Sequence, residues 1–270
     1  MIAVVDNREL SALMQKVKER GGTLRTNFFI DPLRLSNYLK EGFIYYVNSE
    51  QGILLLRKDW DFYHLYYYTN SLESLKILIS TYLPQVKLVT DIIGQDLLVM
   101  QTVEIFETVG FKSKKKLCRY VRMNNLNSNY YLKSNEVSLA VIEDAKQIGN
   151  LFIENFNKLF EQVPNLKDVE NLIAQRKILV VKNKDTIKGF LVRTATGKTA
   201  VLNNFLVDKL YRQENIGTKL LQHYINESQD SKRMILWVIA ENEVATNIYK
   251  KHGYFEDNLI DYILVNDLTS

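Results

Sequence analysis

Residues 212–218, with the sequence RQENIGT, have the composition of an anion-binding turn. They follow the apolar run AVLNNFLV (200–207) and precede an amphipathic stretch, so we expect a strand to lead directly into a helix. The first amides of a helix have no partner inside it, and the helix dipole adds positive potential there, so such a turn can bind phosphate. Arg212 would supply a charged donor, Asn215 suits a left-handed turn, and Gly217 lets a ligand approach the backbone.

This pattern alone has a second interpretation. A glycine at the start of a helix is more often present for close packing than for phosphate binding. The choice between phosphate binding and packing therefore depends on what the rest of the chain resembles.

Other chemistry-bearing side chains form no recognisable cluster in the sequence. The three histidines, His64, His223 and His252, lie far apart, and the last two are expected at surface positions of helices. We find neither metal-ligand spacing nor a Ser-His-Asp arrangement. The sequence predicts no metal site.

Composition limits the class of protein. The chain has 270 residues, 46% of them hydrophobic and 24% charged, which suits one large or two medium globular domains. Cys118 is the single cysteine, so no intrachain disulfide can form. The start, MIAVVDNREL, becomes charged too soon for a signal peptide, and no apolar run approaches the roughly 20 residues of a membrane helix. We therefore expect a soluble, cytoplasmic protein without a membrane partner.

The net charge of +4 is mild, and the densest basic run is KSKKKLCRYVR, residues 112–122. It could be a nucleic-acid footprint or a hairpin arm with a solvated face and lysines at an edge strand. We favour the hairpin arm because no known nucleic-acid module accompanies the run, so no nucleic-acid partner is expected. The tyrosine-rich run FYHLYYY (62–68) is expected to pack between layers.

The clearest change of composition is NNLNSNYYLKSN, residues 124–135. Asn and Ser side chains compete with regular backbone pairing, so we interpret this region as a linker. It divides the chain into a first domain, 1–123, and a second, 136–270.

The second domain alternates strands and helices in an order that predicts a mixed α/β sheet with helices on both faces. Its early strands are expected to be antiparallel, with a parallel pair around the third helix and a terminal hairpin. The expected elements are strand 136–140, helices 143–162 and 166–176, strands 177–183, 187–195 and 199–207, helix 216–228, strand 233–240, helix 243–253 and one or two strands in 254–266.

On these elements, residues 212–218 resemble the R/Q-x-x-G-x-G/A pyrophosphate loop of the GNAT acetyltransferase superfamily. Arg212 matches the first position and Gly217 the last, whereas Asn215 stands where the family usually has its first glycine. The lead-in, LVDKLYR (206–212), is also similar to that of the family.

A second stretch, LWVIAENEVATNIYKKHGY (236–254), resembles the family pattern of a strand followed by N-x-x-A-x-x-x-Y-x-x-x-G-F/Y. The matching residues are Asn242, Ala245, Tyr249, Gly253 and Tyr254. The resemblance covers residues 131–266.

The resemblance implies that acyl-coenzyme A, most simply acetyl-CoA, enters a gap between two splayed parallel strands, 200–207 and 234–240. It implies strand-like pairing of the pantetheine arm, amides that hold the pyrophosphate, and Asn242 facing the arm. The implied coenzyme-binding residues are Leu206, Val207, Arg212, Gln213, Glu214, Asn215, Ile216, Gly217, Thr218 and Asn242.

For catalysis, the resemblance assigns Tyr249 as the general acid beside the sulfur; the alternative is an aromatic core residue on an amphipathic helix. The general base is open. Many family members have a carboxylate on the strand before the loop, where this chain has Asn203 and Asn204. The carboxylates of Glu154, Glu161 and Glu241 are distant candidates that suit solvated surface better, and a water chain is a further possibility.

The function implied is an N-acyltransferase, most simply an N-acetyltransferase, that acts on an amine of a small molecule, peptide or protein. Two alternatives remain. One is a non-catalytic coenzyme-binding or scaffolding protein, and the other is an aminoacyl-tRNA-dependent transferase of the tandem-GNAT type, against which the loop 212–217 argues. The sequence leaves the acceptor and the oligomeric state open.

The first domain is expected to be a degenerate copy of the same fold that neither binds coenzyme A nor catalyses. Counting back from Gly110, Phe106 occupies the place of Tyr249, and Val99 that of Asn242. A chance similarity is the alternative, because this element order is common. The expected elements are helices 7–20 and 32–42, strands 43–49, 52–59 and 62–69, helix 71–83, strand 86–93, helix 99–111 and strand 115–123.

Overall fold

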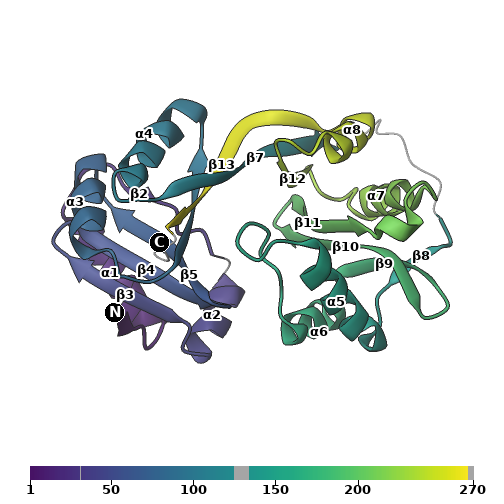
Figure 1. The fold of residues 1–270 in the computed structure, drawn as a ribbon, viewed down its shortest axis with the longest axis horizontal. Coiled ribbons are helices and arrows are strands. Elements are labelled where there is room, and N and C mark those ends of the chain that lie inside the picture. Colours follow the sequence, from purple (N-terminus) through teal and green to yellow (C-terminus); the bar gives the residue numbers. More distant parts are fainter. Residues whose placement is uncertain (31, 125–133, 267–270) are drawn as a thin grey trace. The chain divides into compact units, whose positions relative to one another are not determined.

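The computed structural model describes residues 1–30, 32–124 and 134–266 (Figure 1). The chain divides into two compact units. Unit 1 consists of Met1–Leu117 together with Leu259–Ser270, and unit 2 consists of Cys118–Asn258. Most of the expected linker, residues 125–133, lies outside the described residues.

Unit 1 is a mixed sheet with helices packed on it. Its strand order is β1-β3-β4-β5-β6-β13-β7, and β2 also pairs with β5. The elements are β1 (Ile2–Ala3), α1 (Asn7–Glu19), β2 (Arg25–Thr26), α2 (Pro32–Lys40), β3 (Ile44–Ser49), β4 (Gly52–Asp59), β5 (Phe62–Thr69), α3 (Leu72–Tyr82), β6 (Leu88–Gly94), α4 (Asp96–Glu107), and parts of β7 (Lys112–Met123) and β13 (Phe255–Asn266).

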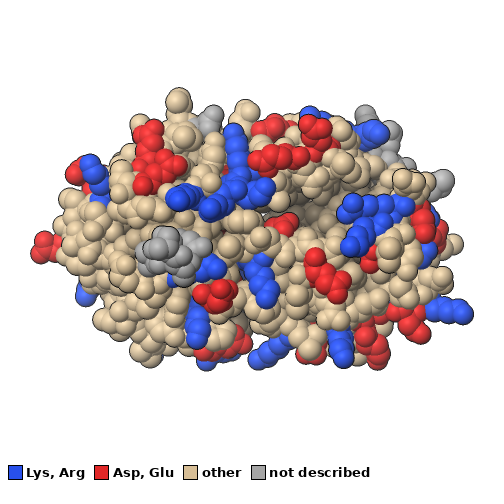
Figure 2. Space-filling model, in the orientation of Figure 1, with Lys and Arg blue, Asp and Glu red and all other residues tan. Residues whose placement is uncertain are grey.

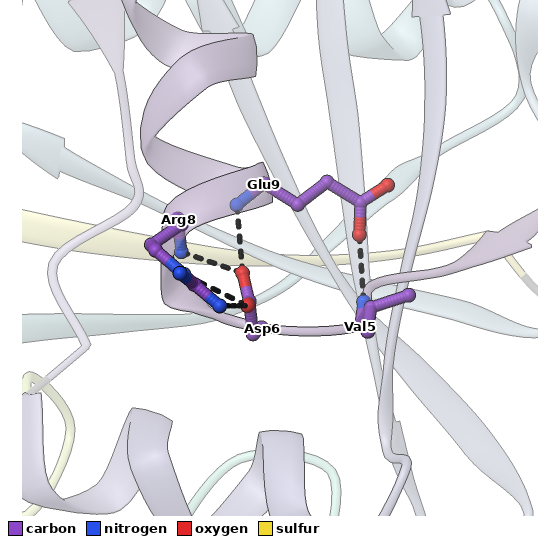
Figure 3. Close-up of polar contacts among 4 residues, drawn as sticks. All are labelled: Val5, Asp6, Arg8 and Glu9. Carbon is purple, nitrogen blue, oxygen red and sulfur yellow. Dashed lines mark hydrogen bonds and ion pairs between the residues drawn. The ribbon is translucent and has the colours of Figure 1, made fainter.

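The first helix shows how local sequence sets an element boundary (Figure 3). The Asp6 carboxylate accepts hydrogen bonds from the amides of Arg8 (2.8 Å) and Glu9 (2.9 Å), so α1 begins at Asn7. The Glu9 carboxylate in turn accepts a hydrogen bond from the Val5 amide at 2.7 Å. Leucine and valine side chains at helical spacing on α1 then pack against the strands of unit 1.

The tyrosine-rich strand β5 lies in the interior of unit 1. It pairs with β4 along its whole length, from Gly52↔Thr69 to Asp59↔Phe62. Tyr66, Tyr67 and Tyr68 are all buried, as expected for residues that pack between layers. The rings of Phe28 and Tyr66 are nearly perpendicular, with their centroids 5.4 Å apart.

Unit 2 has the strand order β8-β9-β10-β11-β12-β7-β13. Strands β8 to β11 are antiparallel, and β11 and β12 are parallel, as expected. The further elements are β8 (Val137–Leu139), η1 (Ile142–Asp144), α5 (Ala145–Asn155), α6 (Leu166–Ala174), β9 (Ile178–Asn183), β10 (Thr186–Thr196), β11 (Thr199–Val207), η2 (Lys209–Tyr211), α7 (Ile216–Glu227), β12 (Arg233–Ile239) and α8 (Glu243–Lys251).

Helices cover both faces of the unit 2 sheet (Figure 1). Phe152 of α5 packs against Phe190 of β10, with ring centroids 4.8 Å apart, in a core that α6 completes. On the opposite face, Ile216 of α7 lies against Gly189 of β10, where an added Cβ would stand 3.0 Å from its side chain. Alternate residues of β10 therefore contact helices on opposite sides.

Two long strands, β7 and β13, each belong partly to unit 1 and partly to unit 2. Strand β13, at the end of the second half, pairs antiparallel with β6 of unit 1, from Ile260↔Gly94 to Asn266↔Leu88. Strand β7, at the end of the first half, lies beside β12 of unit 2. The compact units therefore differ from a division at residues 124–135, because each contains part of a strand from the other half.

Three other expectations need correction. The expected terminal hairpin is wrong, because residues 255–266 form the single strand β13. The basic run 112–122 is not at an edge, because β7 lies between β13 and β12. The helix expected to reach residue 162 ends at Asn155, since Phe156 adopts an extended conformation (φ −117°, ψ 144°) and the Asn157 side chain accepts a hydrogen bond from the Leu159 amide at 2.9 Å.

No helix among the described residues is long and apolar enough to cross a membrane.

Candidate functional site

A gap opens in the unit 2 sheet where two parallel strands diverge. Strands β11 and β12 are paired from Thr199↔Arg233 to Leu202↔Leu236. Beyond Leu202, β11 continues along β10, and the register shifts there so that Asn203 is an extra residue in β11. A bulge of this kind bends its strand, which turns β11 away from β12.

The loop after β11 is built by local hydrogen bonds and unusual backbone angles. Asp208 accepts a hydrogen bond from the Leu210 amide at 2.9 Å and thereby starts the short helix η2. Gln213 (φ 79°) and Asn215 (φ 58°) then adopt left-handed conformations, and α7 begins at Ile216. Asn tolerates this conformation better than most residues, which explains why it can replace a glycine at position 215.

The N-terminus of α7 presents free amides. The first helical hydrogen bond runs from the Lys219 amide to the Asn215 carbonyl at 3.0 Å, and the Asn215 side chain does not cap the helix. Among the described residues, the amides of Ile216, Gly217 and Thr218 have no hydrogen-bond acceptor. Four exposed residues, 212–215, precede them, so an anion can reach this turn from solvent.

Gly217 has a packing role as well. A Cβ at this position would lie 3.3 Å from the ring of Phe205 and 3.4 Å from a methyl group of Val207. The start of α7 therefore contacts the end of β11 closely. Both interpretations of this glycine, ligand access and close packing, are compatible with the structure.

Lys188 of β10 contacts this loop, although no sequence motif indicated it. Its ammonium group lies 2.7 Å from the Glu214 carboxylate and 4.9 Å from the centre of the Tyr211 ring. Its carbonyl accepts a hydrogen bond from the Asp208 amide at 2.9 Å. The pairing of β10 with β11 brings Lys188 here, and that register cannot be read from either strand alone.

Tyr249 lies on α8 against the end of β11. Its ring centroid is 6.3 Å from that of Phe205 and 5.9 Å from that of Tyr254, and the side chain is buried. Burial raises the pKa of Tyr249 well above its usual value, so the hydroxyl stays protonated at neutral pH. The structure thus places Tyr249 beside the same strand end as the loop.

Asn242 begins α8. Its side-chain oxygen accepts a hydrogen bond from the Ala245 amide at 3.1 Å, which is an N-cap interaction. The resemblance predicts that Asn242 faces the coenzyme arm, and the structure shows that it caps α8 just after β12.

The strand before the loop carries amides where a base would be expected. The Asn203 side-chain oxygen accepts a hydrogen bond from the Thr194 hydroxyl at 2.8 Å, and the Asn204 amide lies 3.5 Å from the Glu161 carbonyl. The Glu161 carboxylate accepts a hydrogen bond from the Asn157 amide at 2.8 Å. Glu161 thus reaches β11 through its backbone.

A cavity of about 360 Å³ lies on another side of α8. Glu243, Thr246, Asn247 and Lys250 line it from the helix, whereas Tyr249 is on the helix face toward β11. Val238 and Ala240, beyond the part of β12 that pairs with β11, also line the cavity, whereas no residue of β11 or of the loop does.

Comparison with known proteins agrees with this geometry. Residues 145–254, which lie in unit 2, match the Acetyltransferase (GNAT) family. The family match does not extend into the first half of the chain. No curated protein matches the sequence.

Solved structures show the same fold over more of the chain. A tandem GNAT protein from the clavulanic acid biosynthesis pathway aligns over 100% of this chain and 98% of its own (TM-score 0.60, 10% identity). A GCN5-related N-acetyltransferase from Sphaerobacter thermophilus covers 82% of both chains (TM-score 0.56, 13% identity). A GNAT-family acetyltransferase from Colwellia psychrerythraea covers 90% of this chain and 98% of its own (TM-score 0.55, 16% identity). The whole chain therefore has a tandem GNAT fold.

Proposed function

We propose that unit 2 transfers an acyl group, most simply acetyl, from coenzyme A to an amine. The observation that carries the proposal is the combination of diverging parallel strands with a left-handed loop that leads into α7. This combination lies inside the region that matches the GNAT family.

The chain offers two kinds of backbone contact to the donor. The amides at the start of α7 would bind the pyrophosphate, assisted by the helix dipole and by the exposed Arg212. The edge of β11 at Leu206 and Val207 would pair with the pantetheine arm as an added strand does. These contacts would hold the thioester near the point where the two strands separate.

Coenzyme A supplies an activated acyl group as a thioester. The neutral amine forms a bond to the acyl carbon, the carbon–sulfur bond breaks, and the nitrogen loses a proton. Tyr249 would donate a hydrogen bond to the departing sulfur. A free thiol has a pKa of about 8.5, and burial raises that of Tyr249 well above the usual phenol value. Complete transfer of the phenolic proton would be unfavourable, so Tyr249 would stabilise the thiolate by hydrogen bonding.

Strand β11 carries no carboxylate that could act as the general base and remove the proton from the amine. Asn203 and Asn204 can orient an amine or a water through their amide groups, but an amide is not a base. The proposal is therefore that the acceptor enters as the minor neutral amine or loses its proton through water.

The absence of that carboxylate supports a second candidate, a coenzyme-binding protein without turnover. An aminoacyl-tRNA-dependent transferase is a third, and the loop at Arg212–Gly217 weighs against it. On the face drawn in Figure 2, basic and acidic side chains are interspersed, and the net charge is +4. We therefore propose a small molecule, peptide or protein as the acceptor and no nucleic-acid partner.

The test is release of free thiol from acetyl-CoA in the presence of a panel of amines. Amine-dependent release supports the transferase, whereas tight coenzyme binding without release supports the second candidate. Arg212→Ala should weaken coenzyme binding without disturbing the fold, because Arg212 is exposed. Arg8→Ala, a change of the same type at a residue with 94% side-chain exposure in unit 1, is the control. Equal affinities for both variants would contradict the assignment of the loop.

A further inference from the structure

Unit 1 also contains a parallel pair of strands that diverge. Strands β5 and β6 are paired at Tyr63↔Leu88 and His64↔Val89, at the beginning of each strand. Beyond these positions β5 runs on to Thr69 and β6 to Gly94. The arrangement repeats that of β11 and β12, which diverge after Leu202↔Leu236.

In unit 1 a segment of the chain itself lies in this gap. Strand β2 pairs antiparallel with β5 at Arg25↔Thr69 and Thr26↔Tyr68. The other edge of β5 is already paired with β4 at the same two positions, Gly52↔Thr69 and Ile53↔Tyr68. A strand has two edges, so β2 must lie on the edge that faces β6.

The next residue, Asn27, joins the two diverging strands. Its side-chain nitrogen donates to the Leu65 carbonyl (3.3 Å) of β5, and to the Thr90 hydroxyl (3.0 Å) and the Asp91 carbonyl (2.9 Å) of β6. Its oxygen accepts a hydrogen bond from the Tyr67 amide at 2.8 Å. Asn27 is 6% exposed, and its side chain provides partners for the Tyr67 amide and the Asp91 carbonyl, whereas the Leu65 carbonyl also accepts a hydrogen bond from the Thr90 hydroxyl at 2.9 Å.

The same segment covers the turn between β5 and α3. The Asn70 side chain donates to the Val17 carbonyl at 3.1 Å and also to the Gly21 carbonyl. Gly22 (φ +89°) lies so close that a Cβ would stand 3.0 Å from the Cβ of Asn70. Ser71 accepts a hydrogen bond from the Ser74 amide and so caps α3 itself. The N-terminus of α3 is thus already capped, unlike that of α7.

We propose that residues 17–27 permanently fill the gap between the diverging strands β5 and β6, which we call the unit 1 slot. Unit 1 therefore binds no coenzyme A, and each chain binds one molecule. The second part rests on the proposed function of unit 2. In the described part of the chain, no strand takes the corresponding edge of β11 beyond Leu202. The segment replaces a bound arm by strand pairing at Arg25 and Thr26 and by the side chain of Asn27.

The space that remains is small. A cavity of about 180 Å³ is lined by Arg25, Thr26 and Tyr67 together with residues of β6 and α4. Ligand pockets usually have roughly 300–1,000 Å³, so this remnant does not accommodate a coenzyme arm while β2 is in place.

Hydrogen exchange tests the occupant without any coenzyme. The Tyr67 amide is bonded to Asn27, so it should exchange slowly in the intact protein. Asn27→Ala should accelerate its exchange by about tenfold or more, because several hydrogen bonds are lost together. The exposed Asn37 of α2 provides the control, and Asn37→Ala should leave the rate unchanged. Fast exchange of the Tyr67 amide in the intact protein would overturn the proposal.

A cross-link tests the coenzyme count. In a Cys118→Ala background, Arg25→Cys with Thr69→Cys places two thiols at paired positions of an antiparallel ladder, where Cα atoms lie about 4.5–5.5 Å apart and a disulfide can form. Calorimetric titration with coenzyme A should give one site per chain in both the reduced and the oxidised protein. Two sites in the reduced protein and one in the oxidised protein would show a displaceable segment and overturn the proposal. Zero sites in both would contradict the function of unit 2, and the exchange experiment would still decide whether the slot is occupied.

Discussion

At the scale of single residues, the phosphate loop contains an acidic side chain that its neighbour neutralises. Glu214 lies among the amides proposed to bind pyrophosphate, and its carboxylate is 2.7 Å from the Lys188 ammonium. Glu214 is about half exposed, with 48% of its side chain accessible, so the pair itself contributes little to stability. We expect the ion pair to matter for coenzyme binding, because Lys188 neutralises the negative charge of Glu214 beside the proposed phosphate site.

We therefore expect Lys188→Ala to weaken coenzyme A binding by about fivefold, which corresponds to about 1 kcal/mol. Unfolding temperature should change little. The double variant Lys188→Ala, Glu214→Gln should recover most of the affinity, because the unpaired carboxylate is gone. Calorimetry on the single and double variants measures both effects. If the second change gives no recovery, Lys188 acts directly on the ligand and the neutralisation argument fails.

Tyr249→Phe separates chemistry from packing at the other end of the site. The ring contacts with Phe205 and Tyr254 remain, so the free energies of unfolding and of coenzyme binding should each change by no more than about 1 kcal/mol. A hydrogen bond to the leaving sulfur would be lost, so kcat should fall by about 10²-fold or more. Steady-state rates with a working amine measure this. Full turnover by the variant would make Tyr249 a core residue and nothing more.

At the scale of elements, local pattern predicts what local chemistry determines. The strands β4 and β5 match their expected ranges because turn residues bound two short, nearly continuous apolar runs, which are typical of buried strands. The start of α7 was placed correctly at Ile216 because Asn215 and Gly217 mark the turn. Strand β2 was missed, because two residues carry no periodicity and their pairing with β5 depends on tertiary structure.

The candidate site divides in the same way. The loop and Tyr249 follow from sequence motifs that lie on single elements. The contact of Lys188 with the loop could not be predicted without the β10–β11 register. The point where β11 separates from β12 depends on the bulge at Asn203. The capping role of Asn242 could have been read from its position three residues before Ala245, since Asn is a favoured N-cap residue.

Strand β13 carries two aspartates in opposite environments. Asp261 is buried; burial, and then the nearby Asp91, raise its pKa well above the usual value. Asp257 instead accepts hydrogen bonds from the Arg119 guanidinium, with Nε 3.0 and 3.1 Å from its two oxygens. Burial thus favours the protonated form of Asp261, whereas Asp257 forms an ion pair with Arg119.

The sign of the Asp261 effect follows from proton binding. Its folded pKa is above the unfolded one, so the folded state binds more protons, and the stability it contributes is lost as pH rises from about 4 through the folded value. Asp261→Asn should flatten this decline and raise Tm at neutral pH, by about 3 °C for each kcal/mol, with little effect near pH 4. Asp257→Asn should lower Tm instead, because it removes the partner of Arg119. Thermal unfolding from pH 4 to 8 tests this, and a steeper decline for Asp261→Asn would contradict it.

At the scale of the whole molecule, the exchange of strands makes each half of the sequence incomplete. Residues 260–266 pair with β6 and contribute Ile260, Ile263, Leu264 and Val265 to the buried core of unit 1. Residues 118–123 lie in unit 2, where Arg122 donates a hydrogen bond to the His252 carbonyl at 3.0 Å. Hairpin formation by the terminal strand was the expectation from sequence, because pairing partners that lie far apart in the chain leave no trace in either strand.

The strands that each half contributes to the other unit predict how the chain behaves when it is cut. Cleavage at a protease site introduced within residues 125–133 should leave the two fragments bound to each other, because each keeps a strand in the sheet of the other. They should co-elute at the mass of the intact chain and separate in denaturant. A matched control ends the chain after Asn258, which removes the strand paired with β6. Unit 1 should then lose most of its protection from hydrogen exchange, since an open sheet edge and an uncovered apolar core remain. Fragments that separate after the first cut, each with its native circular dichroism, would show that both halves fold without exchanged strands.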